Sequence, residues 1–311
     1  MSGVVGIYVT KEDLISLEHQ ASSLSYQSNG IARKKRQGNL RSSLLGRGGE
    51  FEKVRQYTLG DDIRNIDWNI TAKERTPYVR VFNEETEKPL VVFVDQTESM
   101  FFATQKQLKS VVAARLASYV LWMASNKKRP VGAVILGDTE SIVLRPKTSK
   151  RYLVELFTHI ASYNQRLSAQ SHVHVTKNLF EDELTKLSQT VSRDTQVVIV
   201  SDFLQMTEKG WYGLEALSRK NSVVAMPIYD GVVKALPIEG SFFAKNSDTQ
   251  GFLSFDSLLE RNDVEERVTG IQRMLTHKLK ELGIPALMFS TYQSVDEQFV
   301  DGAWTMGGIG V

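Results

Sequence analysis

The sequence predicts an α/β protein with a doubly wound, mostly parallel sheet. Runs rich in valine and isoleucine at residues 90–94, 131–136 and 196–200 have the length and composition of buried strands. Longer segments with apolar residues at helical spacing separate these runs. Such alternation is typical of a parallel sheet with helices on both faces.

The overall composition limits the class of protein. A chain of 311 residues suits one large α/β domain with a smaller attached part. The net charge of +2 gives no general attraction for nucleic acid or anionic membranes. The absence of cysteine excludes disulfides, thiolate metal sites and cysteine nucleophiles. We find neither a signal peptide nor a membrane-spanning segment, and we expect a cytoplasmic protein.

Residues 1–83 are expected to form an N-terminal extension. Thr10, followed three residues later by Asp13, predicts the start of an amphipathic helix. The basic stretch at residues 33–47 lacks interleaved aromatic residues, which favours a solvated linker over a nucleic-acid site. A segment dense in Gly, Asp and Arg then leads to an alternating strand at residues 76–82.

Residues 84–292 are expected to form the main domain, with a small β-hairpin insertion near residues 232–256 whose turn lies at residues 248–251. The glycine-rich tail, residues 300–311, is expected to be disordered. The remaining expected strands cover residues 141–144, 223–230 and 286–289, and the expected helices cover residues 108–124, 150–161, 177–191, 207–217 and 264–282.

Hard oxygen donors follow two of the predicted strands. Asp95 ends the first, and Thr97 and Ser99 follow at alternate positions. Open α/β sheets place their ligand sites at the carboxyl ends of strands, and this donor set suits Mg²⁺ or Mn²⁺. Asp202 ends a later strand and is predicted at the same edge. Thr148, which precedes a predicted helix, is the candidate for a hydroxyl ligand from a second loop.

Two alternatives compete with a metal site. In one, the polar residues at 95, 97 and 99 only cap the following helix and its preceding turn. A fixed cation such as Lys150 or Arg64 would favour that interpretation by replacing the ion. In the other, Asp95 is the nucleophile of a magnesium-dependent phosphohydrolase, which needs a second acid two residues later. Position 97 is threonine, so we expect no enzyme activity.

The chain resembles a known family. Residues 46–68 read G-x-G-x-E-F-x-x-x-R-x-Y-x-x-G-D-D-x-R-x-I-D-W, and Ala72-Lys73 and D-Q-T-x-S-M follow. This pattern is similar to the domain of unknown function 58 family, bacterial proteins that resemble von Willebrand factor A domains. The resemblance covers roughly residues 25–290. Its D-x-[ST]-x-S loop resembles a metal-ion-dependent adhesion site, with Thr97 where serine is usual.

The resemblance implies a von Willebrand factor A-like fold and a role beside MoxR-type AAA+ ATPases. Polar and aromatic residues of the 46–68 run are then either an internal brace that pins this module to the sheet edge or a docking surface for the ATPase. Dense alternating charge favours the brace. These structural or partner-binding residues are Glu50, Arg55, Tyr57, Gly60, Asp61, Asp62, Arg64, Asp67 and Trp68.

Taken together, the residues and the resemblance predict a non-enzymatic, metal-assisted protein-interaction adapter. Its expected partners are a MoxR-type AAA+ ATPase and other von Willebrand factor A-like proteins, in protein assembly or maturation. The alternative is a metal-free structural scaffold. Sensitivity of partner binding to a chelator separates the two.

Overall fold

The computed structural model divides into two units. The sheet unit comprises residues 1–31 and 88–311, and the hairpin unit comprises residues 32–87. We describe each by itself. Within them, the structure describes residues 6–23, 50–58, 61–83, 88–104, 106–168, 178–230, 240–245, 250–255 and 258–299.

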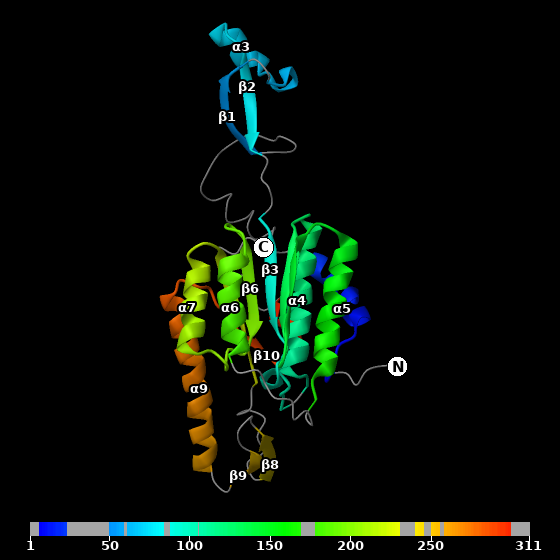
Figure 1. Ribbon diagram of the computed structural model, residues 1–311, viewed down its shortest axis with the longest axis vertical. Helices are drawn as coiled ribbons and strands as arrows, with labels where there is room; N and C mark the ends of the chain where they lie inside the picture. The colour runs from blue at the N-terminus through cyan, green and yellow to red at the C-terminus, as the bar shows by residue number, and fades with distance from the viewer. Residues whose placement is uncertain are drawn as a thin grey trace. The chain divides into compact units, whose positions relative to one another are not determined.

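The sheet unit is built on a six-stranded sheet with the order β10-β7-β6-β3-β4-β5 (Figure 1). Every neighbouring pair is parallel except β4 and β5. This confirms the predicted mixed α/β class with a mostly parallel sheet. The strands are β3 (Leu90–Asp95), β4 (Val131–Leu136), β5 (Ser141–Lys147), β6 (Gln196–Ser201), β7 (Ser222–Tyr229) and β10 (Phe289–Ser290).

Strand β3 lies in the middle of the sheet, and all six of its residues are buried. Val92 and Val94 belong to the hydrophobic cluster on one face, whereas Val91 and Phe93 belong to the cluster on the other. A strand covered on both faces has no solvent side, so its sequence is continuously apolar and does not alternate.

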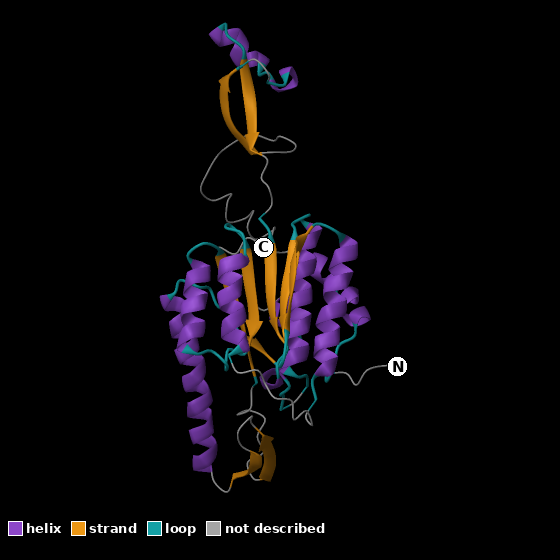
Figure 2. Cartoon of the chain, in the orientation of Figure 1, coloured by secondary structure: helices purple, strands orange, loops and turns teal. Residues whose placement is uncertain are grey.

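Helices cover both faces of the sheet (Figure 2). The first cluster contains residues of α4 and α5, and the second contains residues of α6, α7 and the last turns of α9. Short α10 packs against α4. The helices of this unit are α1 (Lys11–Ser16), α4 (Lys109–Asn126), α5 (Lys150–Arg166), α6 (Leu179–Thr190), α7 (Glu208–Ser218), α9 (Leu258–Glu281) and α10 (Val295–Gln298).

Helix α1 belongs to the sheet unit. Its capping box between Thr10 and Asp13 is confirmed. Leu14 is fully buried, and its carbonyl oxygen accepts hydrogen bonds from Ser118 and Trp122 of α4. The predicted N-terminal domain of residues 1–83 is therefore divided, because its first helix packs against α4 and α5 of the sheet unit.

The hairpin unit pairs β1 (Glu50–Gln56) with β2 (Tyr78–Asn83) in antiparallel fashion. Between them lie a 3₁₀ turn, η1 (Ile63–Asn65), and helix α3 (Trp68–Glu74). The sequence predicted β2 but neither β1 nor α3. Strand β1 is mostly charged and polar, so its composition carries no strand signal.

The insertion after β7 is a β-hairpin, as predicted. Strands β8 (Gly240–Lys245) and β9 (Gln250–Phe255) pair in antiparallel fashion. The turn was predicted at residues 248–251, but Gln250 and Gly251 are paired residues of β9. The basic stretch at residues 33–47 and the tail at residues 300–311 lie outside the described residues.

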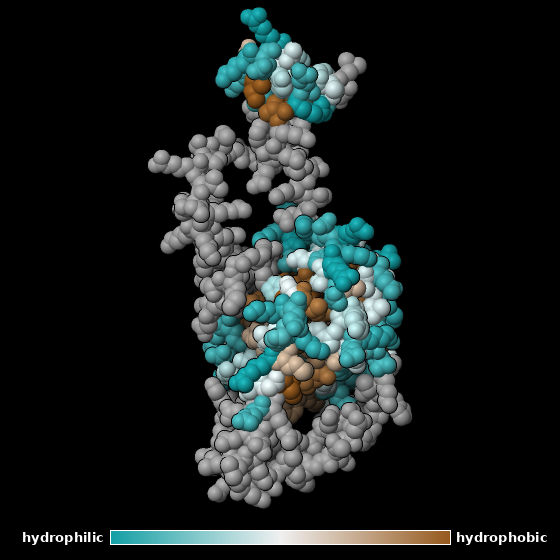
Figure 3. All heavy atoms as spheres, turned by 90° about the vertical axis from the view of Figure 1, so that its left-hand side faces the viewer, coloured by the Kyte–Doolittle hydropathy of each residue, from teal (hydrophilic) through white to brown (hydrophobic). Residues whose placement is uncertain are grey.

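Figure 3 shows the face of the sheet unit that carries α7 and α9, with apolar side chains exposed among polar ones. On α9, Leu275 and Leu279 are buried. Ile271 was predicted to lie on the same buried face, but its side chain is 47% exposed. Met274 is 56% exposed. Only the last turns of α9 therefore contribute to the described core. No helix in the described part of the chain has the length and apolarity that crossing a membrane requires.

Candidate functional site

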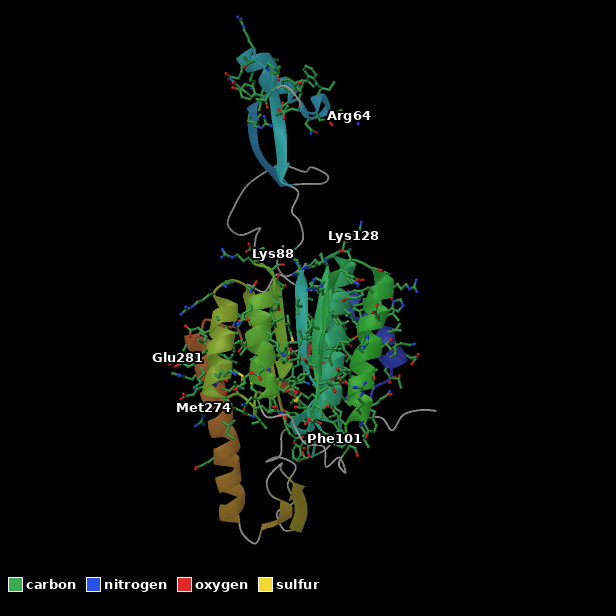
Figure 4. All side chains as sticks on the ribbon, viewed as in Figure 1. Arg64, Lys88, Phe101, Lys128, Met274 and Glu281 are labelled. Carbon is green, nitrogen blue, oxygen red and sulfur yellow. The ribbon has the colours of Figure 1, made fainter. Side chains whose placement is uncertain are left out.

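Asp95, Thr97, Ser99 and Asp202 lie together at the carboxyl edge of the sheet. Strands β3 and β6 are adjacent and parallel, and Val94 pairs with Val200, so the residues that follow them emerge side by side. Figure 4 labels Phe101 at this edge and Lys88 at the opposite, amino-terminal edge. The strand-end rule therefore brings these four side chains together as the sequence predicted.

The carboxylate of Asp95 is fully buried, and both of its oxygens accept hydrogen bonds. Its Oδ1 accepts bonds from the backbone N–H of Thr97 at 3.1 Å and from the Thr97 hydroxyl at 2.7 Å. Its Oδ2 accepts a bond of 2.6 Å from the Ser201 hydroxyl, on β6. Asp95 is thus held in one orientation by its own turn and by the neighbouring strand.

Two hydroxyls connect Asp95 to Asp202. The Oγ1 of Thr97 and the Oγ of Ser99 are 3.2 Å apart, and the Ser99 hydroxyl lies 3.5 Å from Asp202 Oδ1. The Gln205 amide also donates to Thr97 Oγ1 at 2.9 Å. These contacts form a continuous cluster of oxygen atoms across two strand ends.

The helix-cap alternative is wrong for α4. That helix begins at Lys109, its N-cap residue is Leu108, and no side chain caps it. Thr97 precedes the 3₁₀ turn η2 (Glu98–Met100) without a side-chain capping bond. Asp95 does hold the preceding turn through the Thr97 N–H. The polar residues at 95, 97 and 99 face one another and the end of β6 instead of the helix.

A lysine that the sequence reasoning did not consider enters this cluster. The ammonium nitrogen of Lys109 lies 2.5 Å from Asp202 Oδ2, and both side chains are buried. The sequence suggested two other cations for this position. Lys150 pairs with Glu18 on the surface, and Arg64 belongs to the hairpin unit. No local pattern marks Lys109, the first residue of a helix rich in apolar residues, as a partner of Asp202.

Thr148 is not part of the cluster. Strand β5 runs antiparallel to β4, so Ser141 pairs with Leu136 at the carboxyl edge and Lys147 pairs with Val131 at the amino edge. Thr148 follows Lys147 and is exposed. Because β5 reverses direction, its last residues lie at the opposite edge of the sheet from Asp95, and the prediction for Thr148 is corrected.

Two further strand-end acids hold the loop that follows β3. Asp138 accepts a hydrogen bond of 2.7 Å from the Glu98 N–H. Asp230 accepts bonds from the Thr104 N–H at 2.8 Å and from the hydroxyls of Thr104 and Thr291. Sequence reasoning missed both, although each follows a strand closely, and the strand-end signal that found Asp202 would also have found them.

The electrostatics of the cluster favour an added cation. Burial and, secondarily, the charge of Asp202 raise the pKa of Asp95 to about 7, against the lowering effect of its bonds from Ser201 and Thr97. Burial also raises the pKa of Asp138. Lys109 supplies one positive charge to this group of acids. A carboxylate whose pKa rises because its charged form is costly is stabilised by a nearby positive charge.

The donor chemistry of the cluster fits a hard divalent cation. Two carboxylates and two hydroxyls are oxygen donors of the kind that Mg²⁺ and Mn²⁺ prefer. The described residues contain no group of three or more His, Cys, Asp or Glu side chains placed to hold a metal. An ion at this position would therefore use the hydroxyls of Thr97 and Ser99 and water as its other ligands.

Acidic residues of the hairpin unit mainly organise their own turns. The guanidinium of Arg55 pairs with Asp61 at 2.7 Å, and this pairing holds the pKa of Asp61 well below its usual range. The Thr58 N–H also donates to Asp61. Asp62 caps η1, and Asp67 caps α3. These bonds support a structural role of these residues within the hairpin unit.

Other residues of the predicted motif are open to solvent. Trp68 is 70% exposed, Arg64 is exposed, and Tyr57 is partly buried, with its backbone N–H bonded to Pro77. Glu50 lies in β1 without a described side chain, and Gly60 lies outside the described residues. The exposed ring of Trp68 is consistent with the docking interpretation.

We expect Asp67→Ala to destabilise α3 by about 1 kcal/mol, the usual loss for an N-cap. Asp67 Oδ1 accepts bonds from the N–H groups of Asn69 and Ile70, and alanine removes that acceptor. Amide hydrogen exchange of residues 69–74 measures the effect, with exposed Glu74→Ala as the control. Equal exchange in both variants would contradict the capping role.

The chain matches one family model and several curated proteins. The model, described as protein of unknown function DUF58, matches residues 53–271. Uncharacterized protein Rv1480 of Mycobacterium tuberculosis and uncharacterized protein Mb1516 of Mycobacterium bovis are each 25% identical to this chain over 251 residues. Each match covers 80% of this chain and 76% of the relative.

Solved structures give more distant matches. One is the conserved hypothetical protein BatB from Bacteroides thetaiotaomicron, with a TM-score of 0.41 and 8% identity over 70% of this chain and 97% of that chain. Another is an aerotolerance-related membrane protein from Bacteroides fragilis, with a TM-score of 0.43 and 13% identity over 70% of this chain and 100% of that chain.

Proposed function

We propose that this chain, which belongs to the DUF58 family of proteins of unknown function, is a non-enzymatic adapter that binds a protein partner with the help of a divalent cation. One observation carries the proposal. The carboxylates of Asp95 and Asp202 and the hydroxyls of Thr97 and Ser99 form one cluster at the carboxyl edge of the sheet.

Mg²⁺ or Mn²⁺ would be held by these four side chains. Such ions keep several waters and take only a few protein ligands, which suits a site with two carboxylates. When bound, the ion supplies a position at which an acidic group of a partner replaces a water. Ser99 is only partly buried, so the cluster has a solvent side at which a partner can approach.

The nature of the partner and the finer fold assignment rest on the family resemblance. We propose a von Willebrand factor A-like sheet domain that works in the cytoplasm with a MoxR-type AAA+ ATPase and other von Willebrand factor A-like proteins, in protein assembly or maturation. The exposed Trp68 of the hairpin unit is a candidate contact for the ATPase.

The residue at position 97 argues against a phosphohydrolase. A phosphoaspartyl nucleophile needs a second acid two residues later to serve as acid and base. Position 97 is threonine. We therefore keep the proposed function as binding without catalysis.

A metal-free scaffold is the second candidate, and the ion pair between Lys109 and Asp202 favours it. The ammonium lies 2.5 Å from the carboxylate in a buried position. A carboxylate that already has a buried partner charge does not require a metal ion to be stable. In this case the cluster would only fix the loop, and partner binding would use other surfaces.

Titration with Mn²⁺ and Mg²⁺ by calorimetry tests the proposal. We expect saturable binding to the wild type and its loss in Asp95→Asn, which keeps the side-chain volume but removes the charge that a hard cation needs. Thr148→Ala is the matched control, because Thr148 lies at the opposite edge of the sheet, and it should bind as the wild type does.

Absence of binding in the wild type would remove the metal-assisted function and leave the scaffold. Binding that survives in Asp95→Asn would place the ion elsewhere. If the wild type does bind, capture of a MoxR-type ATPase with and without a chelator should show loss of the complex in the chelator. A complex indifferent to the chelator would separate metal binding from partner binding.

A further inference from the structure

Lys109 occupies a position that physical chemistry disfavours for lysine. It is the first residue of the 18-residue helix α4, and its side chain is buried. The amino end of a helix carries a partial positive charge, which repels an ammonium group. Removal of an ammonium from water is also costly unless an anion pairs with it. A specific partner must therefore account for a lysine at this place.

That partner is Asp202. The ammonium is 2.5 Å from its Oδ2, while its Oδ1 accepts bonds from the Leu204 N–H at 3.0 Å and from the Ser99 hydroxyl at 3.5 Å. The ring of Phe102, which is 42% exposed, has its centroid 5.7 Å from the same ammonium. The lysine thus stands between an acid of the proposed ion site and a ring at its rim.

We propose that Lys109 is a built-in cation that competes with the divalent ion for Asp202 and thereby sets the affinity of the site. This inference rests on the proposed function, because it concerns the same cluster. A single positive charge a few ångströms from a divalent ion repels it strongly in a poorly solvated site. Binding of the ion therefore weakens the hold of Asp202 on Lys109, and the Phe102 ring, which the ammonium already contacts, remains a favourable neighbour for it.

The inference predicts the direction in which metal affinity changes. Removal of the ammonium removes the competing charge, so Lys109→Met and Lys109→Gln should each bind Mn²⁺ at least about tenfold more tightly than the wild type. Lys106→Met is the matched control, since it loses the same charge three residues earlier from an exposed side chain. Screening by solvent should keep its affinity within about twofold of the wild type.

Calorimetric titration of the full chain with Mn²⁺ measures these affinities. Thermal unfolding provides a second readout. In a chelator, the Lys109 variants should unfold at a lower temperature than the wild type, because Asp202 has lost its counter-charge. Addition of Mn²⁺ should raise the unfolding temperature more in the Lys109 variants than in Lys106→Met. If Lys109→Met does not fold, Lys109→Gln carries the test, because its amide can still donate to Asp202.

The outcomes separate this inference from the proposed function. If the wild type binds Mn²⁺ as tightly as both Lys109 variants, or more tightly, the proposed competition is overturned and the metal-assisted function stands. Binding found only in the Lys109 variants supports the competition and favours the metal-free scaffold for the wild type. Absence of binding in every protein overturns both.

Discussion

Replacement of Asp202 by alanine is expected to lower the free energy of unfolding by about 3–5 kcal/mol, the usual cost of breaking a buried ion pair from one side. The variant leaves the Lys109 ammonium buried beside α4 without its carboxylate partner. Urea-induced unfolding in a chelator measures the change. The control is Glu140→Ala, which breaks the pair between Glu140 and Arg166, both about 60% exposed, and should cost no more than about 1 kcal/mol.

The double variant Lys109→Met/Asp202→Leu should regain most of the lost stability, because replacement of a buried pair by apolar side chains is often neutral or favourable. Together the two experiments distinguish the cost of an unpaired charge from the cost of a lost side chain. If Asp202→Ala lowers the free energy of unfolding by less than about 1 kcal/mol, then water hydrates the Lys109 ammonium or another acid pairs with it.

The central strands could be predicted because their burial dictates their sequence. β3, β4 and β6 are covered on both faces, which forces continuous runs of valine and isoleucine that few helices share. α3 could not be predicted in the same way. It has seven residues and no buried one, so its only local signal is the cap at Asp67, and its end is an Arg75 with a φ of 57°.

Some residues of the candidate site could likewise be predicted from the sequence, and others could not. Asp95 and Asp202 could be placed together because parallel strands end at one edge, a rule that needs no tertiary detail. The prediction for Thr148 was wrong because β5 runs antiparallel to β4, and the composition of a strand does not indicate its direction in the sheet. Lys109 was missed because a lysine in a helix ordinarily reaches solvent, and only the packing of α4 against β6 turns it toward Asp202.

Metal-free wild-type protein is expected to lose stability as the pH rises from about 4 to about 7, relative to Asp95→Asn. Burial and the charge of Asp202 raise the pKa of Asp95 from an ordinary 3.8 to about 7. In that window the folded state keeps a proton that the unfolded chain has released. The contribution of Asp95 to stability is therefore fully present below its pKa in the unfolded chain, and it is lost as the pH rises through its pKa in the folded protein. Such a shift corresponds to roughly 4 kcal/mol at most.

Comparison of the wild type with Asp95→Asn isolates this group, because all other titrating residues are common to both proteins. Urea unfolding between about pH 4 and pH 8 in a chelator should give a difference that changes with pH, whereas parallel profiles would contradict a raised pKa for Asp95. With saturating Mn²⁺ the difference should grow in favour of the wild type above about pH 7, since the ion binds the ionised carboxylate and releases the proton. The negative charge of Asp95 thus destabilises the metal-free protein and binds the ion when it is present. Occupancy of the site is therefore coupled to the stability of the fold.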